Sequence, residues 1–327
     1  MPLTEPSTAP EKTKSASRLP VWIRRPLLHG RTFAETKNQV NSCGIPTVCR
    51  NAKCPNMGEC YSRGMATFLI LGEVCTRNCA FCNIAAGLPR PLDPEEPARL
   101  AAAVAALQLH HTVITSVTRD DLEDGGAAHF AACILAVRKR MPSGAVEVLV
   151  PDFRGSLSAI QTVLDAAPHV LTHNVETHPS LYSVVRPMAD YRRSLDLLRH
   201  AARAGKAVAK SGFMVGLGET DEHVREILAD LMEAGCRIVT VGQYLQPSRT
   251  HLPVARFVHP DDFVKYASWG REVGIPFVFS APLVRSSYQA RESFGELNVE
   301  IPVSPSEACR AGGRKRGLRQ KSSRRPG

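Results

Sequence analysis

Apolar, β-branched runs alternate along the chain with stretches whose apolar residues recur at helical spacing. The apolar runs predict strands at 67–71, 112–117, 146–150, 170–175, 207–215 and 237–241, with a further short strand at 277–279. The helical patterns predict helices at 94–107, 127–140, 157–165, 191–204, 222–234 and 260–273. This alternation is typical of repeated strand-helix units and therefore predicts an α/β protein.

The number of predicted strands favours an incomplete barrel. Six main strands with five intervening helices are too few for a closed (β/α)8 barrel, so we expect a partial (β/α)6 TIM-type barrel with N-terminal and C-terminal extensions. An open doubly wound sheet is the alternative. The expected divisions are a disordered segment at 1–20, an N-terminal extension at 21–64, the barrel at 65–280, a C-terminal extension at 281–309 and a basic disordered tail at 310–327.

The formal net charge of +10 lies mostly at the C-terminal end. From Arg310 onward the chain carries a series of arginines and lysines and no acidic residue, so the remainder is close to balanced. A run of this kind is typical of a solvated tail, with contact to RNA or to an acidic partner as the alternative. We therefore do not expect nucleic acid to be a partner, and the charge does not decide the function.

The cysteines indicate metal ligation. No run approaches the roughly 18 to 20 apolar residues that cross a bilayer, and residues 1–26 lack an apolar secretory core, so we expect a cytoplasmic protein that does not bind membranes. The cytosol keeps thiols reduced, and ten cysteines there are poor candidates for disulfides. Seven of them lie close together in the chain: Cys43, Cys49, Cys54, Cys60, Cys75, Cys79 and Cys82.

A first triplet, Cys75, Cys79 and Cys82, has C-x3-C-x2-C spacing directly after the first predicted strand. Three thiolates on so short a loop can hold three irons of a 4Fe-4S cluster and leave the fourth iron open. An open iron can bind the amino and carboxylate groups of S-adenosylmethionine and pass an electron into its sulfonium, which yields a 5′-deoxyadenosyl radical. A structural zinc site is the alternative, but no second pair of metal ligands follows at zinc spacing.

A second triplet, Cys49, Cys54 and Cys60, stands upstream with C-x4-C-x5-C spacing. It includes Pro55 and Gly58, both of which favour loops, so we expect a folded-back loop that brings three thiolates to one metal centre. Two such triplets predict two clusters. A disulfide or a scattered structural role for these cysteines is the alternative.

Polar residues also follow the other predicted strands. In a barrel, groups at the carboxyl ends of strands meet at one face, where active sites form. Each of these groups alone could be an ordinary polar loop. Because all of them are expected at the same face of the barrel, together they indicate an active site there. The positions are Arg119, Asp120, Asp121, Asn174, Glu176, Gly216, Gly218, Glu219, Gln243 and Gln246.

Taken together, these motifs resemble the lipoyl synthase family. The resemblance covers about 21–294 and rests on both cysteine triplets and on the segments 119–126, 173–177, 242–248 and 285–288, the last reading R-S-S-Y. The triplet with C-x4-C-x5-C spacing and the R-S-S-Y segment occur together in that family, which makes the resemblance specific. One small departure is Ala281 before Pro282, where the family pattern has glycine.

The resemblance implies the insertion of sulfur at C6 and C8 of an octanoyl chain. The chain would be attached to a lysine of a lipoyl carrier domain or H protein. The cluster on the first triplet would cleave S-adenosylmethionine twice, and the cluster on the second would donate sulfur. In the family a serine holds the second cluster's remaining iron, and that serine corresponds to Ser287.

The resemblance also implies cofactor contacts and partners. Asn174, Glu176 and Gln246 would lie near S-adenosylmethionine. The expected partners are an electron donor such as ferredoxin or flavodoxin and a carrier that rebuilds the consumed cluster. Because radical chemistry on a saturated chain must exclude water, we also expect a narrow apolar channel for the tethered substrate.

Three other functions remain open from the sequence. One is another sulfur-inserting radical enzyme, similar to biotin synthase or to a tRNA methylthiotransferase. The second is a zinc-stabilised protein whose tail binds nucleic acid. The third is a radical enzyme whose second triplet only transfers electrons. Metal analysis separates the second from the others, since two 4Fe-4S clusters give brown protein with roughly eight irons.

Overall fold

The computed structural model describes residues 19–24, 30–287 and 290, and its centre is a curved parallel sheet of seven strands. The strands follow one another in chain order, each paired with the next, and among the described residues no pairing joins the first to the last. The order never reverses, so the doubly wound alternative is wrong and the open barrel is confirmed. The strands are β1(Thr67–Ile70), β4(His111–Ser116), β5(Ala145–Leu149), β6(Val170–Thr172), β7(Val208–Val215), β8(Ile238–Gln243) and β9(Phe277–Ser280).

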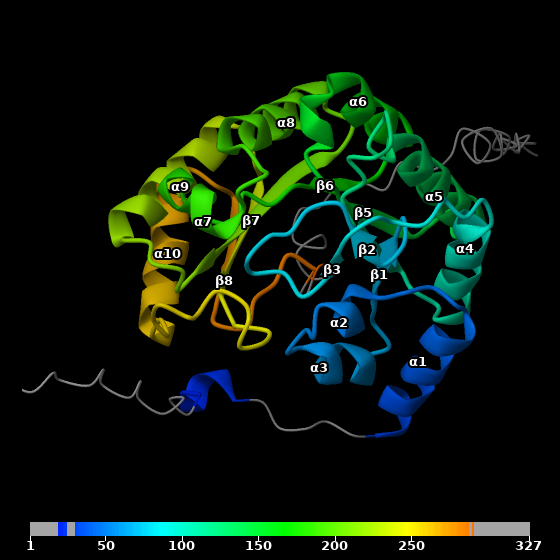
Figure 1. Ribbon diagram of the computed structural model, residues 1–327, viewed down its shortest axis with the longest axis horizontal. Coiled ribbons are helices and arrows are strands. Elements are labelled where there is room, and N and C mark those ends of the chain that lie inside the picture. The colour runs from blue at the N-terminus through cyan, green and yellow to red at the C-terminus, as the bar shows by residue number, and fades with distance from the viewer. Residues whose placement is uncertain (1–18, 25–29, 288–289, 291–327) are drawn as a thin grey trace, which may run out of the picture.

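Six long helices form an arc outside the sheet (Figure 1). Three of them, α5, α6 and α8, have the bounds that the apolar spacing predicts, and the others differ by one or two residues. Local signals account for the ends of α8, since Asp190 caps its first turn and Gly205, with φ of 63°, follows its last. The helices are α4(Glu96–Ala106), α5(Ala127–Arg140), α6(Leu157–Asp165), α8(Tyr191–Ala204), α9(Asp221–Glu233) and α10(Pro260–Glu272).

The core lies mainly between the sheet and these helices. One apolar cluster joins β1, β4 and β5 to α4, α5 and α6, and a second joins β7 and β8 to α8, α9 and α10. Inside the barrel, however, Glu147 of β5 and Lys210 of β7 are buried as an ion pair with N–O distance 2.8 Å. Their strands read as apolar in sequence, and nothing in that pattern indicated the pair.

The N-terminal extension lies at the open side of the arc (Figure 1). It contains α1(Arg31–Ser42), α2(Val48–Asn51) and α3(Met57–Ser62), none of which the sequence analysis predicted. The buried hydroxyl of Thr36 in α1 donates to the carbonyl of Tyr61 in α3 at 2.8 Å. The second cysteine triplet is therefore not a simple loop, because Cys49 lies in α2 and Cys60 in α3.

Several predictions concern residues outside the described part of the chain. They include most of the 1–20 segment, most of the 281–309 extension and the whole basic tail. The divisions proposed from the sequence therefore stay predictions.

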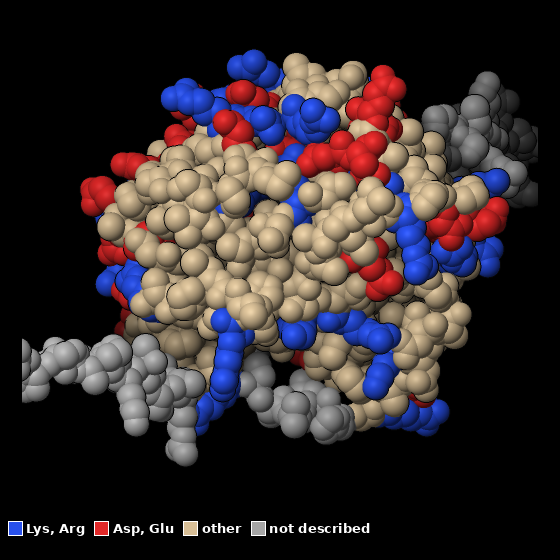
Figure 2. Space-filling model, viewed as in Figure 1, with Lys and Arg blue, Asp and Glu red and all other residues tan. Residues whose placement is uncertain are grey.

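Figure 2 shows acidic and basic side chains interspersed along the upper edge, over α6 and α8, and few charges in the middle of that face. No helix within the described ranges has the length and apolar character to span a bilayer.

Candidate iron-sulfur and cofactor sites

The first cysteine triplet lies on a loop that is closed at both ends by a short ladder. Strand β2(Val74–Cys75) pairs in parallel with β3(Ala85–Ala86), and the amide of Gly87 donates to the carbonyl of Cys75 at 2.9 Å. The sulfur of Cys75 accepts from the backbone amides of Arg77 and Thr118 at 3.4 and 3.3 Å. Amides directed at a sulfur stabilise its charged form, as they do around iron-sulfur clusters.

The backbone around the other two cysteines is held from the opposite side of the barrel. The amide of Ala80 donates to the carbonyl of Val185 at 3.0 Å, and the ring of His251 donates to the carbonyl of Cys82 at 3.0 Å. Burial, with smaller contributions from Cys79 and Cys75, raises the pKa of Cys82 to about 12. The three thiols therefore lie close enough to interact electrostatically, and a bound cation would reverse these shifts.

Arg77, inside the triplet, clamps the loop to two strands. Its guanidinium donates to both carboxylate oxygens of Asp120, after β4, at 2.7 and 2.9 Å and to both of Asp152, after β5, at 3.0 and 2.7 Å. Arg77 is only 6% exposed. Burial alone would lower the pKa of Arg77, but these hydrogen bonds raise it, so the clamp remains charged.

The start of the loop is held by a second set of contacts. Leu71 has φ of 67°, in the left-handed region that a branched residue rarely adopts. Its amide donates to Glu96 at 2.9 Å, and its carbonyl accepts from Arg119 at 3.2 Å. The same Glu96 oxygen also accepts from His129 at 2.7 Å. These partners fix the turn that leads from β1 into the cysteine loop.

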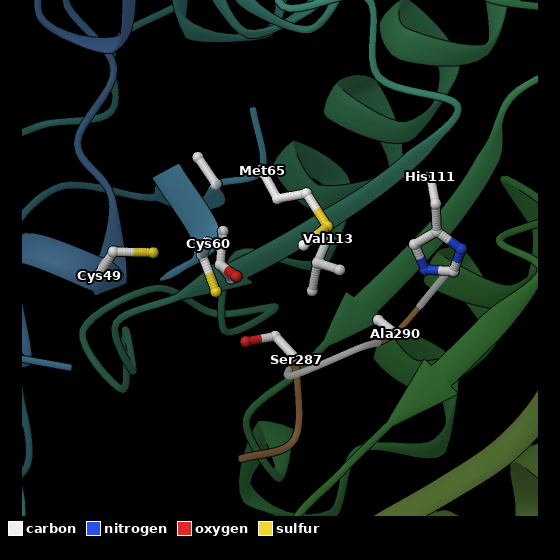
Figure 3. A pocket seen from close by; sticks show the side chains of 9 residues that line it. Cys49, Cys60, Met65, His111, Val113, Ser287 and Ala290 are labelled. Carbon is white, nitrogen blue, oxygen red and sulfur yellow. The ribbon is translucent and has the colours of Figure 1, made fainter. Parts of the chain in front are cut away.

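The second triplet also converges on one place. Burial is the main cause that raises the pKa of Cys49 to about 11 and of Cys60 to about 12, and Cys54 contributes to both shifts through its charge. Cys49 and Cys60 line a small cavity together with Ser287. Figure 3 shows the Ser287 hydroxyl turned toward the two sulfurs. Two thiols and one hydroxyl thus face the same space, and Cys54 lies close enough to act on both thiols through its charge.

The thiols of each triplet are spaced more widely than the sulfur ligands of a single zinc ion. Within the described residues, the one group of three metal-ligand side chains whose donor atoms all lie within 4.8 Å is Glu96, His129 and Cys133, between α4 and α5. Neither cysteine triplet is that tight. Zinc holds its sulfur ligands at about 2.3 Å, which would bring them closer together than that. All nine cysteines in the described part are free thiols, so these two sets of soft donors fit iron-sulfur clusters.

Two of the three predicted cofactor contacts lie together. Asn174 and Glu176 follow β6, and the Asn174 amide donates to Glu176 at 3.1 Å. Glu176 has φ of 66°, and its backbone pairs with Phe213 of β7. Burial raises the pKa of Glu176, although Arg186 and Arg285 act in the opposite direction.

Gln246, the third predicted contact, lies elsewhere. Its side chain is exposed and donates to the carbonyl of His251 at 2.8 Å. No hydrogen bond among the described residues joins it to the pair after β6, so its contact with the cofactor stays a prediction. Gln243 is fully buried and has a structural role, because its amide donates to the carbonyls of Val215, Tyr244 and Arg256.

The sequence analysis missed three residues at these sites. Ser286 donates to Asn174 at 2.8 Å, and the buried Asn56 donates to the carbonyl of Leu283 at 2.6 Å. Asp152 completes the clamp on Arg77. Each contact joins segments at least 75 residues apart, so no local pattern indicates it. The one usable signal was that Asp152 comes directly after a predicted strand, where barrel sites form.

Comparison with solved structures supports the fold. The hydrogenase maturase HydG from Carboxydothermus hydrogenoformans aligns with TM-score 0.54 and 18% identity, covering 71% of this chain and 56% of that one. Streptococcus suis SuiB bound to S-adenosylmethionine aligns with TM-score 0.51 and 11% identity, and the alignment covers 69% of this chain and 54% of that one. At these identities the likeness concerns the fold alone.

Comparison of sequences is more specific. A sequence model of the Radical SAM superfamily matches residues 69–231. The lipoyl synthase of Nitratidesulfovibrio vulgaris strain Hildenborough is 59% identical over 290 residues, which are 89% of this chain and 97% of that protein. The lipoyl synthase of Chlorobium limicola is 47% identical over 288 residues, which are 88% of this chain and 99% of that protein. With its open barrel and two cysteine triplets, this chain belongs to the lipoyl synthase family of radical S-adenosylmethionine enzymes.

Proposed function

We propose that this enzyme inserts sulfur at C6 and C8 of a protein-bound octanoyl group with its own second cluster as the sulfur source. Membership of the family implies one 4Fe-4S cluster, S-adenosylmethionine and an octanoylated carrier protein as substrate. The assignment of ligands is ours: Cys75, Cys79 and Cys82 for the first cluster, and Cys49, Cys54, Cys60 and Ser287 for the second. When bound, the first cluster supplies the electron that cleaves the sulfonium, and the second supplies sulfur.

The observation that carries the proposal is the position of Ser287. It lies more than 200 residues beyond the second triplet in sequence, yet its hydroxyl faces Cys49 and Cys60 across a shared cavity (Figure 3). A serine oxygen is a hard ligand among three soft ones. It is therefore the ligand that is released most easily, and its departure would open the cluster to sulfur extraction.

The cavity beside the second triplet is partly apolar. Besides the two cysteines and the serine it is formed largely by apolar residues at the starts of β1 and β4. Such a surface would keep water from the second cluster, but the cavity is too small to hold an octanoyl chain, so the substrate channel expected from the sequence stays a prediction. The lining residues with apolar side chains are Met65, Ala66, Val113 and Ala290.

The remaining partners follow from the chemistry. Each of the two carbon-hydrogen bonds requires cleavage of one S-adenosylmethionine, and each cleavage consumes one electron. We assign this electron to a low-potential donor such as ferredoxin or flavodoxin. Because sulfur leaves the second cluster with the product, we also assign a carrier protein that delivers new clusters.

Replacement of Ser287 by alanine tests the assignment. The Ser287→Ala variant should keep about eight irons per chain, because three thiolates remain at each site. It should form 5′-deoxyadenosine but complete less than about a tenth of the doubly thiolated product, read by mass spectrometry of an octanoyl-lysine peptide. Product formation at the wild-type level would show that Ser287 is not a ligand.

A further inference from the structure

Two neighbouring serines of the R-S-S-Y segment face different sites. Ser287 lines the cavity with Cys49 and Cys60. The hydroxyl of Ser286 instead donates to Oδ1 of Asn174, after β6, at 2.8 Å. This contact lies against Gly212 of β7, where a Cβ atom would come within 3.2 Å of the Ser286 oxygen and 3.1 Å of Asn174 Oδ1. The backbone here thus leaves just enough room for the pair.

Ser286 anchors the side-chain amide of Asn174. Oδ1 of that amide accepts from Ser286, and Nδ2 donates to Oε1 of Glu176 at 3.1 Å. Rotation of the amide by half a turn would place Oδ1 against the Glu176 carboxylate, which only accepts when ionised, so Glu176 sets the orientation while the Ser286 hydroxyl anchors the other end of the amide. The backbone of Asn174 is held separately, since its carbonyl accepts from Arg186 at 2.8 Å. Loss of the Ser286 hydroxyl would therefore free the amide without moving the backbone.

The segment that carries both serines is tied to the second cysteine triplet as well as to the barrel. The carbonyl of Leu283 accepts from the buried Asn56, which lies between Cys54 and Cys60 in sequence, at 2.6 Å. The carbonyl of Pro282 accepts from the amide of Gln243, at the end of β8, at 3.1 Å. A movement of this segment at one site must consequently be felt at the other.

We propose that Ser286 is a positioning residue for S-adenosylmethionine, which fixes Asn174 and through it Glu176, so that the segment carrying Ser287 also completes the cofactor site. The inference rests on the proposed function for the assignment of the two sites. Its consequence is linkage: cofactor binding stabilises the position in which Ser287 faces the second triplet, and departure of that segment weakens cofactor binding by the same factor.

The dissociation constant of S-adenosylmethionine tests this directly, measured by equilibrium binding to the anaerobically reconstituted enzyme. Loss of one partly buried hydrogen bond predicts that Ser286→Ala binds S-adenosylmethionine about five-fold more weakly, with an unchanged iron content. Ser268→Ala is the matched control: it removes an exposed hydroxyl of α10, which donates to Glu272 at 2.9 Å, and it should bind the cofactor within about two-fold of wild type. Wild-type affinity in Ser286→Ala, or loss of its iron, would overturn the proposal.

A double variant shows whether Ser286 acts through Asn174. If it does, Ser286→Ala combined with Asn174→Ala should bind the cofactor no more weakly than Asn174→Ala alone. If the double variant loses affinity by the product of the factors measured for the two single variants, Ser286 acts elsewhere and the proposal is wrong. These binding measurements do not depend on whether sulfur is inserted. A wild-type enzyme that inserts no sulfur would contradict the proposed function without changing them.

Discussion

Arg77 shows how single residues hold the radical-generating site. It lies between Cys75 and Cys79, and four hydrogen bonds join it to Asp120 and Asp152 on two different loops. A planar guanidinium can bind two carboxylates in this forked way, whereas an ammonium cannot. The cysteine loop has no helix or long strand of its own, so its shape depends on this clamp and on the short ladder beside it.

Replacing Arg77 by lysine should damage the first site alone. The Arg77→Lys variant keeps the charge but loses the fork, which should cost about 2 kcal/mol in the free energy of unfolding. We expect the iron content to fall from about eight toward about four per chain, because the second triplet is unaffected. Iron analysis and paramagnetic resonance with S-adenosylmethionine check this.

A matched control is Arg99→Lys, since Arg99 pairs with Asp93 at 2.8 Å on the exposed side of the barrel. An exposed pair contributes less than about 1 kcal/mol, so this variant should resemble wild type in iron content and stability. If Arg77→Lys also kept its full iron content and spectrum, the clamp would not be required.

At the scale of elements, the sequence predicted the strands and long helices well but not what fills the barrel. Alternating apolar patterns depend on nearby residues, so 127–140 and 191–204 were predicted to the residue. Glu147 and Lys210 lie 63 residues apart on β5 and β7, and the order of the strands, with β6 between them, brings the two side chains together on one face of the curved sheet. Short helices such as α2 have too few turns to show a helical period.

The buried pair predicts a pH dependence of stability. Burial would raise the pKa of Glu147, but Lys210 and His111 lower it from 4.5 to about 2. The folded state therefore favours the carboxylate, and the pair stabilises the protein above about pH 4.5 and ceases to do so as the pH falls toward 2. Glu147→Gln should lose about 3–5 kcal/mol at pH 7, because Lys210 stays buried without its partner. Urea unfolding of the cluster-free chain measures this.

The same experiment has a clear pH signature. The difference in unfolding free energy between wild type and Glu147→Gln should stay constant from pH 7 to about 4.5 and shrink below it. The exposed pair of Asp165 and Lys206, at 2.6 Å, supplies the control, and Asp165→Asn should change stability by less than about 1 kcal/mol. Equal stability of Glu147→Gln and wild type at pH 7 would refute the role of the pair.

For the whole molecule, the central feature is that one barrel brings together two cysteine triplets and a distant serine. The spacing of each triplet was enough to predict clusters, because ligands to one cluster can be close in sequence. The position of Ser287 came only from the family resemblance, since its place beside Cys49 and Cys60 depends on the path of the entire chain. The contact of Ser286 with Asn174 had no signal in sequence at all.

The most direct test of the whole account is a single-turnover assay of wild type and of Cys54→Ala. It uses an octanoyl-lysine peptide, S-adenosylmethionine and a strong reductant, read by mass spectrometry. We expect wild type to replace two hydrogens by two sulfurs, and Cys54→Ala to insert none while still forming 5′-deoxyadenosine. Two sulfurs inserted by Cys54→Ala would contradict the assignment of the second triplet as the sulfur source.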